Sequence, residues 1–110
     1  MSNFDQYCRS YRFMKLERRR GILQMTLHTN GGPLQWDMEA QAEFARAFAE
    51  VGADPENRVI ILTGTGDNFC VSGNSSGWPG KWTAEAWEVL FTEGRRSLEN
   101  LLNIEVPTIS

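Results

Sequence analysis

The run Val59-Ile60-Ile61-Leu62-Thr63-Gly64-Thr65-Gly66-Asp67-Asn68-Phe69-Cys70 decides how this chain of 110 residues folds. Its first four residues are a continuous aliphatic stretch. Such a stretch predicts a strand that is buried on both faces, as in a parallel or mixed sheet with helices packed on it. Gly64-Thr65-Gly66 is expected to end this strand. The following stretch, 71–80, is rich in Gly and Ser and predicts a long loop.

Two stretches upstream of this strand predict an antiparallel hairpin. Apolar and polar residues alternate over Phe13–Glu17 and again over Ile22–His28, and Arg18-Arg19-Arg20-Gly21 lies between them as a charged turn. Residues 1–12 show no clear period and are predicted to form an N-terminal arm. The domain proper is therefore predicted to span residues 13–110.

Two helices are predicted around the same strand. The first begins near Asp37, whose carboxylate can cap the first turn, and Gly52 is expected to stop it. The second spans about Thr83 to Leu102 and carries an apolar stripe. After Pro107, residues 108–110 are expected to open a further strand. The element order β-β-α-β-loop-α-(β) predicts an α/β protein in which helices cover a sheet.

Composition excludes several classes of function. Hydrophobic residues make up 41% and charged residues 23%, as in globular proteins. The net charge of −3 argues against nucleic-acid binding. No apolar run approaches the roughly 20 residues that span a bilayer, and Met1 to Tyr7 contains no apolar signal region, so a cytoplasmic location is expected. Cys8 and Cys70 have no metal-ligand spacing; we expect both to be reduced, and no metal site.

Basic residues gather at the start of the chain. Six of the eleven lie in the first twenty positions, and this basic run could face an anionic ligand or form a solvated edge. The six are Arg9, Arg12, Lys15, Arg18, Arg19 and Arg20.

The run from Val59 to Cys70 resembles the enoyl-CoA hydratase/isomerase (crotonase) superfamily. In that family a buried strand leads into T-G-x-G-x-x-F-C/S and then A-G-x-D. The hairpin, the helix entry from Leu34 to Val51 and the closing stretch Ile104–Ile109 follow in the expected order, so the resemblance covers the chain from about Phe13. It implies the N-terminal half of the spiral ClpP/crotonase fold, truncated before the second oxyanion-hole motif. It also implies a homo-oligomer, a trimer or hexamer.

Four short segments are similar to one branch of that family, the β-diketone hydrolases of the 6-oxocamphor hydrolase type. They are Phe4–Tyr7, Leu27–Thr29, Leu34–Trp36 and Asn100–Pro107. Members of this branch cleave a carbon–carbon bond between two carbonyl groups and do not use coenzyme A.

The resemblance implies that Gly73 is the first backbone N–H donor of an oxyanion hole. A glycine suits this role because the backbone must approach the ligand closely. The alternative is that Gly73 is one glycine of a flexible loop. Ser72 and Asn74 stand where the family usually has Gly and Asp, a departure that weakens the expectation of ordinary acyl-CoA binding and leans toward the β-diketone branch. Asn74 is a candidate substrate-binding residue.

Trp36 and Gln41 are the other candidate substrate-binding residues. Gln41 stands where the β-diketone branch tends to carry a histidine; its amide can hydrogen-bond a carbonyl but cannot move a proton at neutral pH. Two plainer readings stay open, Gln41 as an edge residue of the helix and Trp36 as a core residue. His28, the only histidine, falls on the polar face of the hairpin and is interpreted as structural.

These features lead to two hypotheses of different class. In the first, the full-length protein stabilises an enolate on an acyl-CoA thioester or a cyclic β-diketone, with no bound cofactor. This chain alone is then expected to be inactive, because the second donor and the acid–base groups would lie beyond Ser110. In the second, the chain is a naturally short binding or assembly module. The aromatic cluster could form a pocket wall, a subunit interface or part of the core; it comprises Trp78, Trp82, Trp87 and Phe91.

Overall fold

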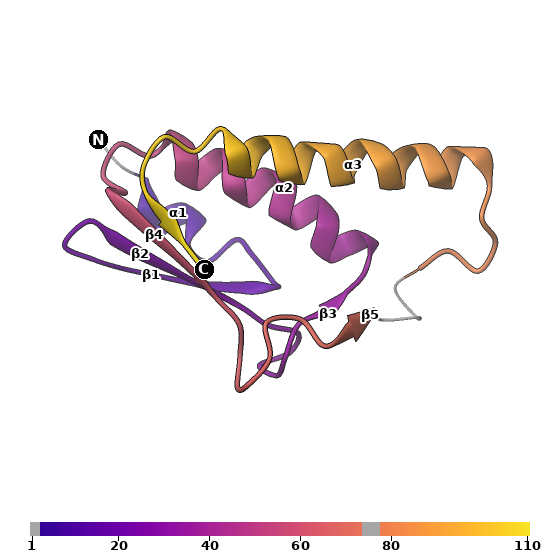
Figure 1. Cartoon of the computed structure of the whole chain (residues 1–110), viewed down its shortest axis with the longest axis horizontal. Coiled ribbons are helices and arrows are strands. Elements are labelled where there is room, and N and C mark those ends of the chain that lie inside the picture. Colours follow the sequence, from indigo (N-terminus) through magenta and orange to yellow (C-terminus); the bar gives the residue numbers. More distant parts are fainter. Residues whose placement is uncertain (1–2, 74–77) are drawn as a thin grey trace.

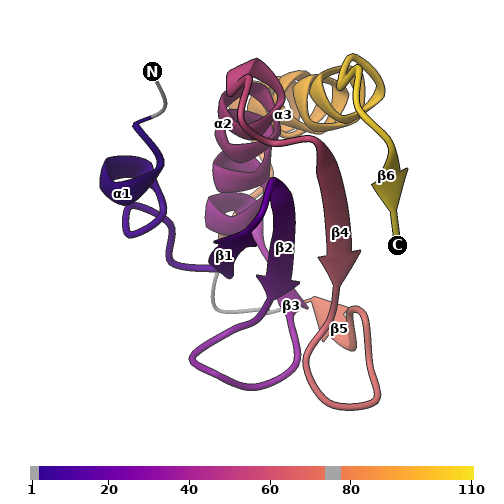
Figure 2. The ribbon, with the colours of Figure 1, turned by 90° about the vertical axis from the view of Figure 1, so that its left-hand side faces the viewer.

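The computed structural model describes residues 3–73 and 78–110. Its main sheet has the strand order β1-β2-β4-β6, seen from left to right in Figure 2, and β3 pairs with β5 in a second, two-stranded sheet. β1 and β2 are antiparallel, whereas β4 runs parallel to both β2 and β6. The elements are α1 (Phe4–Tyr7), β1 (Met14–Arg19), β2 (Ile22–Leu27), β3 (Gln35–Trp36), α2 (Met38–Ala53), β4 (Val59–Thr63), β5 (Ser72–Gly73), α3 (Ala84–Leu102) and β6 (Thr108–Ile109).

Both long helices lie on the same side of the main sheet (Figure 1). α2 supplies Phe44, Phe48 and Val51 to the hydrophobic core, where they meet Leu23 of β2 and Ile60 of β4. α3 runs beside α2, and its first turns extend past the end of the sheet (Figure 1). The α/β fold expected from the sequence is thus confirmed, and the expected elements follow in the expected order; α1, β3 and β5 are additional, and β5 lies in the stretch expected to be a loop.

The predicted hairpin turn has an identifiable geometry. Arg20 and Gly21 have φ angles of 52° and 81°, and they join Arg19 directly to Ile22. Positive φ at both central residues is characteristic of a type I′ turn, whose twist matches that of the flanking strands. A glycine at the second position avoids the strain that a side chain would add there.

β4 departs from its sequence prediction. Ile60 and Leu62 are buried, whereas Val59 and Ile61 on the other face are only partly covered. The prediction of a strand buried on both faces is therefore wrong for the residues described. The helices cover only one face, so Val59 and Ile61 stay partly accessible on the opposite face, where β1 and β2 expose polar residues such as Lys15 and Gln24.

Side-chain caps fix where both long helices begin. Asp37 Oδ1 accepts a hydrogen bond from the Ala40 N–H at 2.8 Å, as predicted, and Thr83 Oγ1 accepts one from the Ala86 N–H at 3.1 Å. The expected stop at Gly52 is wrong, because α2 continues through Ala53. A Cβ at Gly52 would lie 3.1 Å from the Ile104 side chain, so close packing, and not a helix stop, explains this glycine.

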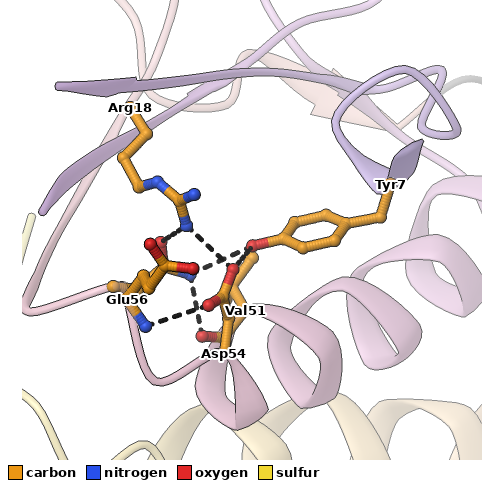
Figure 3. A network of polar contacts seen from close by, with 6 residues as sticks. Tyr7, Arg18, Val51, Asp54 and Glu56 are labelled. Carbon is orange, nitrogen blue, oxygen red and sulfur yellow. Dashed lines mark hydrogen bonds and ion pairs between the residues drawn. The ribbon is translucent and has the colours of Figure 1, made fainter. Parts of the chain in front are cut away.

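A buried polar network joins the C-terminal end of α2 to the start of the chain (Figure 3). The Tyr7 hydroxyl donates to Asp54 Oδ2 at 2.7 Å, and the Arg18 guanidinium donates to the same oxygen at 2.8 Å. Arg18 also donates to Asn57 Oδ1 at 2.9 Å. Tyr7 belongs to the hydrophobic core, so residues 3–12, predicted to be an arm, pack onto the domain.

The remaining bonds of this network define the turn between α2 and β4. The Glu56 N–H donates to Asp54 Oδ1 at 2.9 Å, and the Asn57 amide donates to the Val51 carbonyl at 3.0 Å (Figure 3). The Asn57 amide also lies 3.2 Å from the Tyr7 hydroxyl. Each buried polar group of the turn therefore has a protein partner, which is what burial requires.

Replacement of Asp54 by Ala tests how much this network contributes to the stability of the fold. The Asp54 side chain is 3% exposed and that of Arg18 is 16% exposed, so the change strands a largely buried cation. We expect the free energy of unfolding to fall by about 3 kcal/mol, measured by urea denaturation. Glu39→Ala is the control, because Glu39 pairs with Arg12 at a site where both side chains are more than 60% exposed. Equal losses of unfolding free energy in the two variants would contradict the prediction that the buried pair contributes more than the exposed one.

Tyr7 gives the network a pH dependence. Burial, and then the hydrogen bond to Asp54, raise the pKa of Tyr7 above its ordinary value. In the unfolded chain tyrosine ionises near pH ~10, whereas the folded protein holds the proton to higher pH. The folded state thus binds more protons above pH ~10, and stability must fall as pH rises through that window. We expect Tyr7→Phe to flatten this fall in urea midpoints measured from pH 8 to 11; an unchanged slope would contradict it.

Candidate functional site

The turn after β4 can be made only with glycine at its first position. A Cβ on Gly64 would lie 2.1 Å from the carbonyl oxygen of Asn68 and 2.5 Å from the Cα of Phe69, distances at which backbone atoms overlap. Thr65 adds a hydrogen bond from its hydroxyl to the Leu27 carbonyl at 2.7 Å. The T-G-x-G motif thus folds the chain back on itself and anchors it to the end of β2.

This turn directs the chain into β5, beside β3. The Val71 N–H donates to the Leu34 carbonyl at 2.9 Å, and Gly73 pairs with Trp36 in parallel register. A Cβ on Gly73 would lie 3.6 Å from the Trp36 carbonyl oxygen and 3.3 Å from Nε1 of Trp78. The fold therefore brings two predicted site residues, Trp36 and Gly73, side by side, and it places a second tryptophan, Trp78, against Gly73.

Gln41 is buried, and its amide links three elements. Its Oε1 accepts a hydrogen bond from the Trp36 indole N–H at 3.2 Å, and its Nε2 donates to the Leu90 carbonyl of α3 at 2.7 Å. Gly94 of α3 faces this amide, with room for ordinary van der Waals contact. The sequence could suggest a polar residue here, but it gave no signal for these long-range partners. A substrate contact by Gln41 stays a prediction.

Two further hydrogen bonds hold α3 against α2 at this point. The Ser97 hydroxyl donates to the Gln41 carbonyl at 3.1 Å, and the Asn100 amide donates to the Ala45 carbonyl at 2.8 Å. Side chains of α3 thus donate hydrogen bonds to backbone carbonyls of α2, and these bonds help to fix the position of Gln41 beside β3.

The other predicted residues lie apart from this group. Asn74 falls outside the described residues. His28 accepts a hydrogen bond from the Gly31 N–H at Nδ1, 3.1 Å away, within the turn that follows β2. Cys8 and Cys70 are not joined by a disulfide.

The aromatic cluster forms a row on the surface, so its interpretation as core is wrong for these side chains. Ring centroids are 5.8 Å apart for Trp78 and Trp82, 4.6 Å for Trp82 and Trp87, and 5.7 Å for Trp87 and Phe91. Exposure rises along the row, from a half-buried Trp78 to 65% at Phe91. The row starts against Gly73 and continues along the outer face of α3.

The basic run does not form one patch. Arg18 turns into the buried network and also lies over the ring of Phe4 at 4.3 Å, and Arg12 pairs with Glu39. Arg9 and Lys15 line an open hollow of about 610 Å³ on the hairpin.

Among the described residues, a second hollow and the groups with shifted pKa values lie where the start of the chain meets α2. An open hollow of about 740 Å³ runs between the start of the chain and α2, lined by Tyr11, Arg46 and Glu50 among others. Burial raises the pKa of Tyr11, and the hydrogen bond from Tyr11 to Glu50 raises it further. Burial also raises the pKa of Glu43, whose carboxylate accepts a hydrogen bond from the Phe13 N–H. These groups serve contacts between the start of the chain and α2. Within residues 3–73 and 78–110, no group of three or more metal-ligating side chains could hold a metal ion.

The strand β4, the glycine turn after it and the β3–β5 pair that holds Gly73 define a crotonase-superfamily fold, and the resemblance inferred from the sequence is confirmed. Over 98% of its length the chain matches a β-diketone hydrolase from the cyanobacterium Anabaena sp. PCC 7120, bound to (S)-3-oxocyclohexyl acetic acid, with a TM-score of 0.87 and 32% identity. No protein-family model matches the sequence.

Enoyl-CoA hydratases share the same fold. One from Shewanella pealeana has a TM-score of 0.84 and 15% identity over 98% of this chain, and a hydratase/isomerase from Mycobacterium paratuberculosis has 0.76 and 17% over 89%. The chain spans only 42% of the Anabaena and Shewanella proteins and 40% of the Mycobacterium protein. In the part of the chain that the structure describes, no helix is long and apolar enough to cross a membrane.

Gly64→Ala tests the steric origin of the turn. Because the new Cβ would overlap the backbone of residues 68 and 69, we expect a loss of about 2–3 kcal/mol in the free energy of unfolding, measured by urea denaturation. Gly80→Ala is the matched control, since nothing lies within 4 Å of a Cβ there. A Gly64→Ala variant as stable as the Gly80→Ala variant would disprove the steric argument.

Proposed function

We propose that this chain is the first part of an enzyme that cleaves a cyclic β-diketone, with the Gly73 N–H as one donor to the oxyanion. The carrying observation is the 32% identity to a β-diketone hydrolase over 98% of this chain, against 15% and 17% for the two hydratases. The departures at Ser72 and Asn74 from the acyl-CoA pattern point the same way.

In the proposed reaction, water adds to one of two carbonyl carbons that share a neighbouring carbon. The bond between that carbonyl carbon and the shared carbon then breaks, and its electron pair becomes the enolate of the second carbonyl. Protonation of the shared carbon yields a ketone and a carboxylic acid, so atoms and charge balance. Negative charge grows on the second carbonyl oxygen, which is where a fixed N–H donor lowers the barrier.

Trp36 and Gln41 would shape the pocket around Gly73. The Trp36 ring packs on Phe44 at 5.0 Å, and its indole N–H is held by Gln41. Trp36 would thus present a rigid apolar wall to an alicyclic ring, with Gln41 fixing its orientation; Asn74 stays a candidate contact. The chemistry needs no bound cofactor. A coenzyme A thioester is the alternative substrate, supported by the fold that the hydratases share.

An assembly module is the second candidate, and one observation favours it. α3 exposes large apolar side chains, with Phe91, Leu98 and Leu102 between 63% and 82% accessible. Patches of this kind mark interaction surfaces. This candidate predicts a stable homo-oligomer of the 110-residue chain in sedimentation measurements, and a monomer would count against it.

The enzymatic proposal is tested with the polypeptide made from the native gene. We expect it to hydrolyse a bicyclic 1,3-diketone and to leave crotonyl-CoA unchanged. Gly73→Pro removes the backbone N–H, so the rate should fall about 10²–10³-fold, whereas Gly80→Pro, at a position where nothing lies within 4 Å of an added Cβ, should retain activity. Circular dichroism of both variants checks that the fold persists. Full activity in a folded Gly73→Pro variant would disprove the donor role. If the polypeptide converts neither substrate, the proposal that it is an enzyme of this kind is wrong.

A further inference from the structure

Trp78 places a polar atom directly against Gly73. Its indole Nε1 lies 3.3 Å from the position that a Cβ on Gly73 would take. The ring is half-buried and packs against the neighbouring Trp82, 5.8 Å away between centroids. The planes of the two rings are inclined by 40°, and Nε1 of Trp78 lies on the side of its ring that meets Gly73.

The two indoles around Gly73 differ in how their N–H groups are used. The Trp36 N–H donates to Gln41. For Trp78, none of the hydrogen bonds between described residues uses the indole N–H. No fully buried side-chain nitrogen or oxygen of the described residues lacks a partner, so this nitrogen is open to solvent and a bound molecule can reach it. The Trp78 N–H is therefore placed to donate to a bound molecule.

We infer that Trp78 is a substrate-binding residue whose indole N–H donates to the same ketone oxygen as the Gly73 N–H. This inference rests on the proposed function, because it assigns the ligand of that site. The ligand class is a cyclic ketone or diketone, whose oxygen accepts two hydrogen bonds and whose ring packs against indole faces.

A neutral indole donor suits this oxygen. It strengthens as negative charge develops on the oxygen, because hydrogen bonds to ionised acceptors are shorter and stronger than those to neutral ones. It has no proton to lose near neutral pH, so it adds no pH dependence. The absence of a side chain at Gly73 is what allows the indole nitrogen to approach.

Indole and glycine amide resonances provide the direct test. The polypeptide from the native gene is labelled with ¹⁵N-Trp and ¹⁵N-Gly and titrated with (S)-3-oxocyclohexyl acetic acid as the probe. We expect the Trp78 Nε1–H and the Gly73 N–H to move downfield together, whereas the indole of Trp87 stays in place. Trp78→Phe and Trp87→Phe assign the two indole signals.

Affinity supplies the second readout. Trp78→Phe keeps an aromatic ring but removes the N–H, so the Kd for the probe should rise about 3- to 10-fold. Trp87→Phe, in the same aromatic row but not against Gly73, should leave Kd unchanged.

The outcomes separate the two proposals. A shift of the Gly73 amide without a shift of the Trp78 indole, or an unchanged Kd in Trp78→Phe, would overturn the inference and leave the proposed function standing. If no amide or indole resonance moves at saturating probe, the proposed β-diketone function is wrong, and the inference falls with it.

Discussion

Asp54 receives hydrogen bonds from both Tyr7 and Arg18 at the C-terminal end of α2. A carboxylate at that end of a helix opposes the helix dipole, and burial raises its cost further. The guanidinium of Arg18 offsets both effects, and it does so from β1, so the helix and the hairpin cannot move apart without stranding two charges. Because α2 is fixed at this end, the position of its first turns is fixed too.

The candidate site depends on that constraint. Gln41 lies near the start of α2, where it holds the Trp36 indole and reaches the Leu90 carbonyl of α3. From the other side, the overlap that any side chain at Gly64 would create sends the chain back toward β3. The hydrogen bond from Trp36 to Gln41 and the tight turn at Gly64 thus place Gly73 beside Trp36. Together they fix the position of Gly73, the candidate donor.

Much of this fold can be predicted from local patterns in the sequence. Alternation around Gly21 predicts the hairpin, Asp37 predicts the start of α2, and the glycine motif predicts the end of β4, because each is decided by neighbours in the chain. The rest depends on distant partners. Nothing in the spacing of Tyr7 and Asp54 indicates a hydrogen bond between them. Strands of two residues, such as β3 and β5, are too short to show a period. The uncovered face of β4 is predicted to be buried because aliphatic residues do not reveal which elements cover them.

The spacing of the surface tryptophans has an optical consequence. Trp82 and Trp87 lie 4.6 Å apart with planes inclined by 30°, close enough for their electronic transitions to couple. Coupled indoles produce a pair of circular dichroism bands of opposite sign that overlap the peptide region. The far-ultraviolet spectrum of this protein would then misstate its helix content, and the same bands would serve as a built-in reporter of whether the start of α3 is ordered.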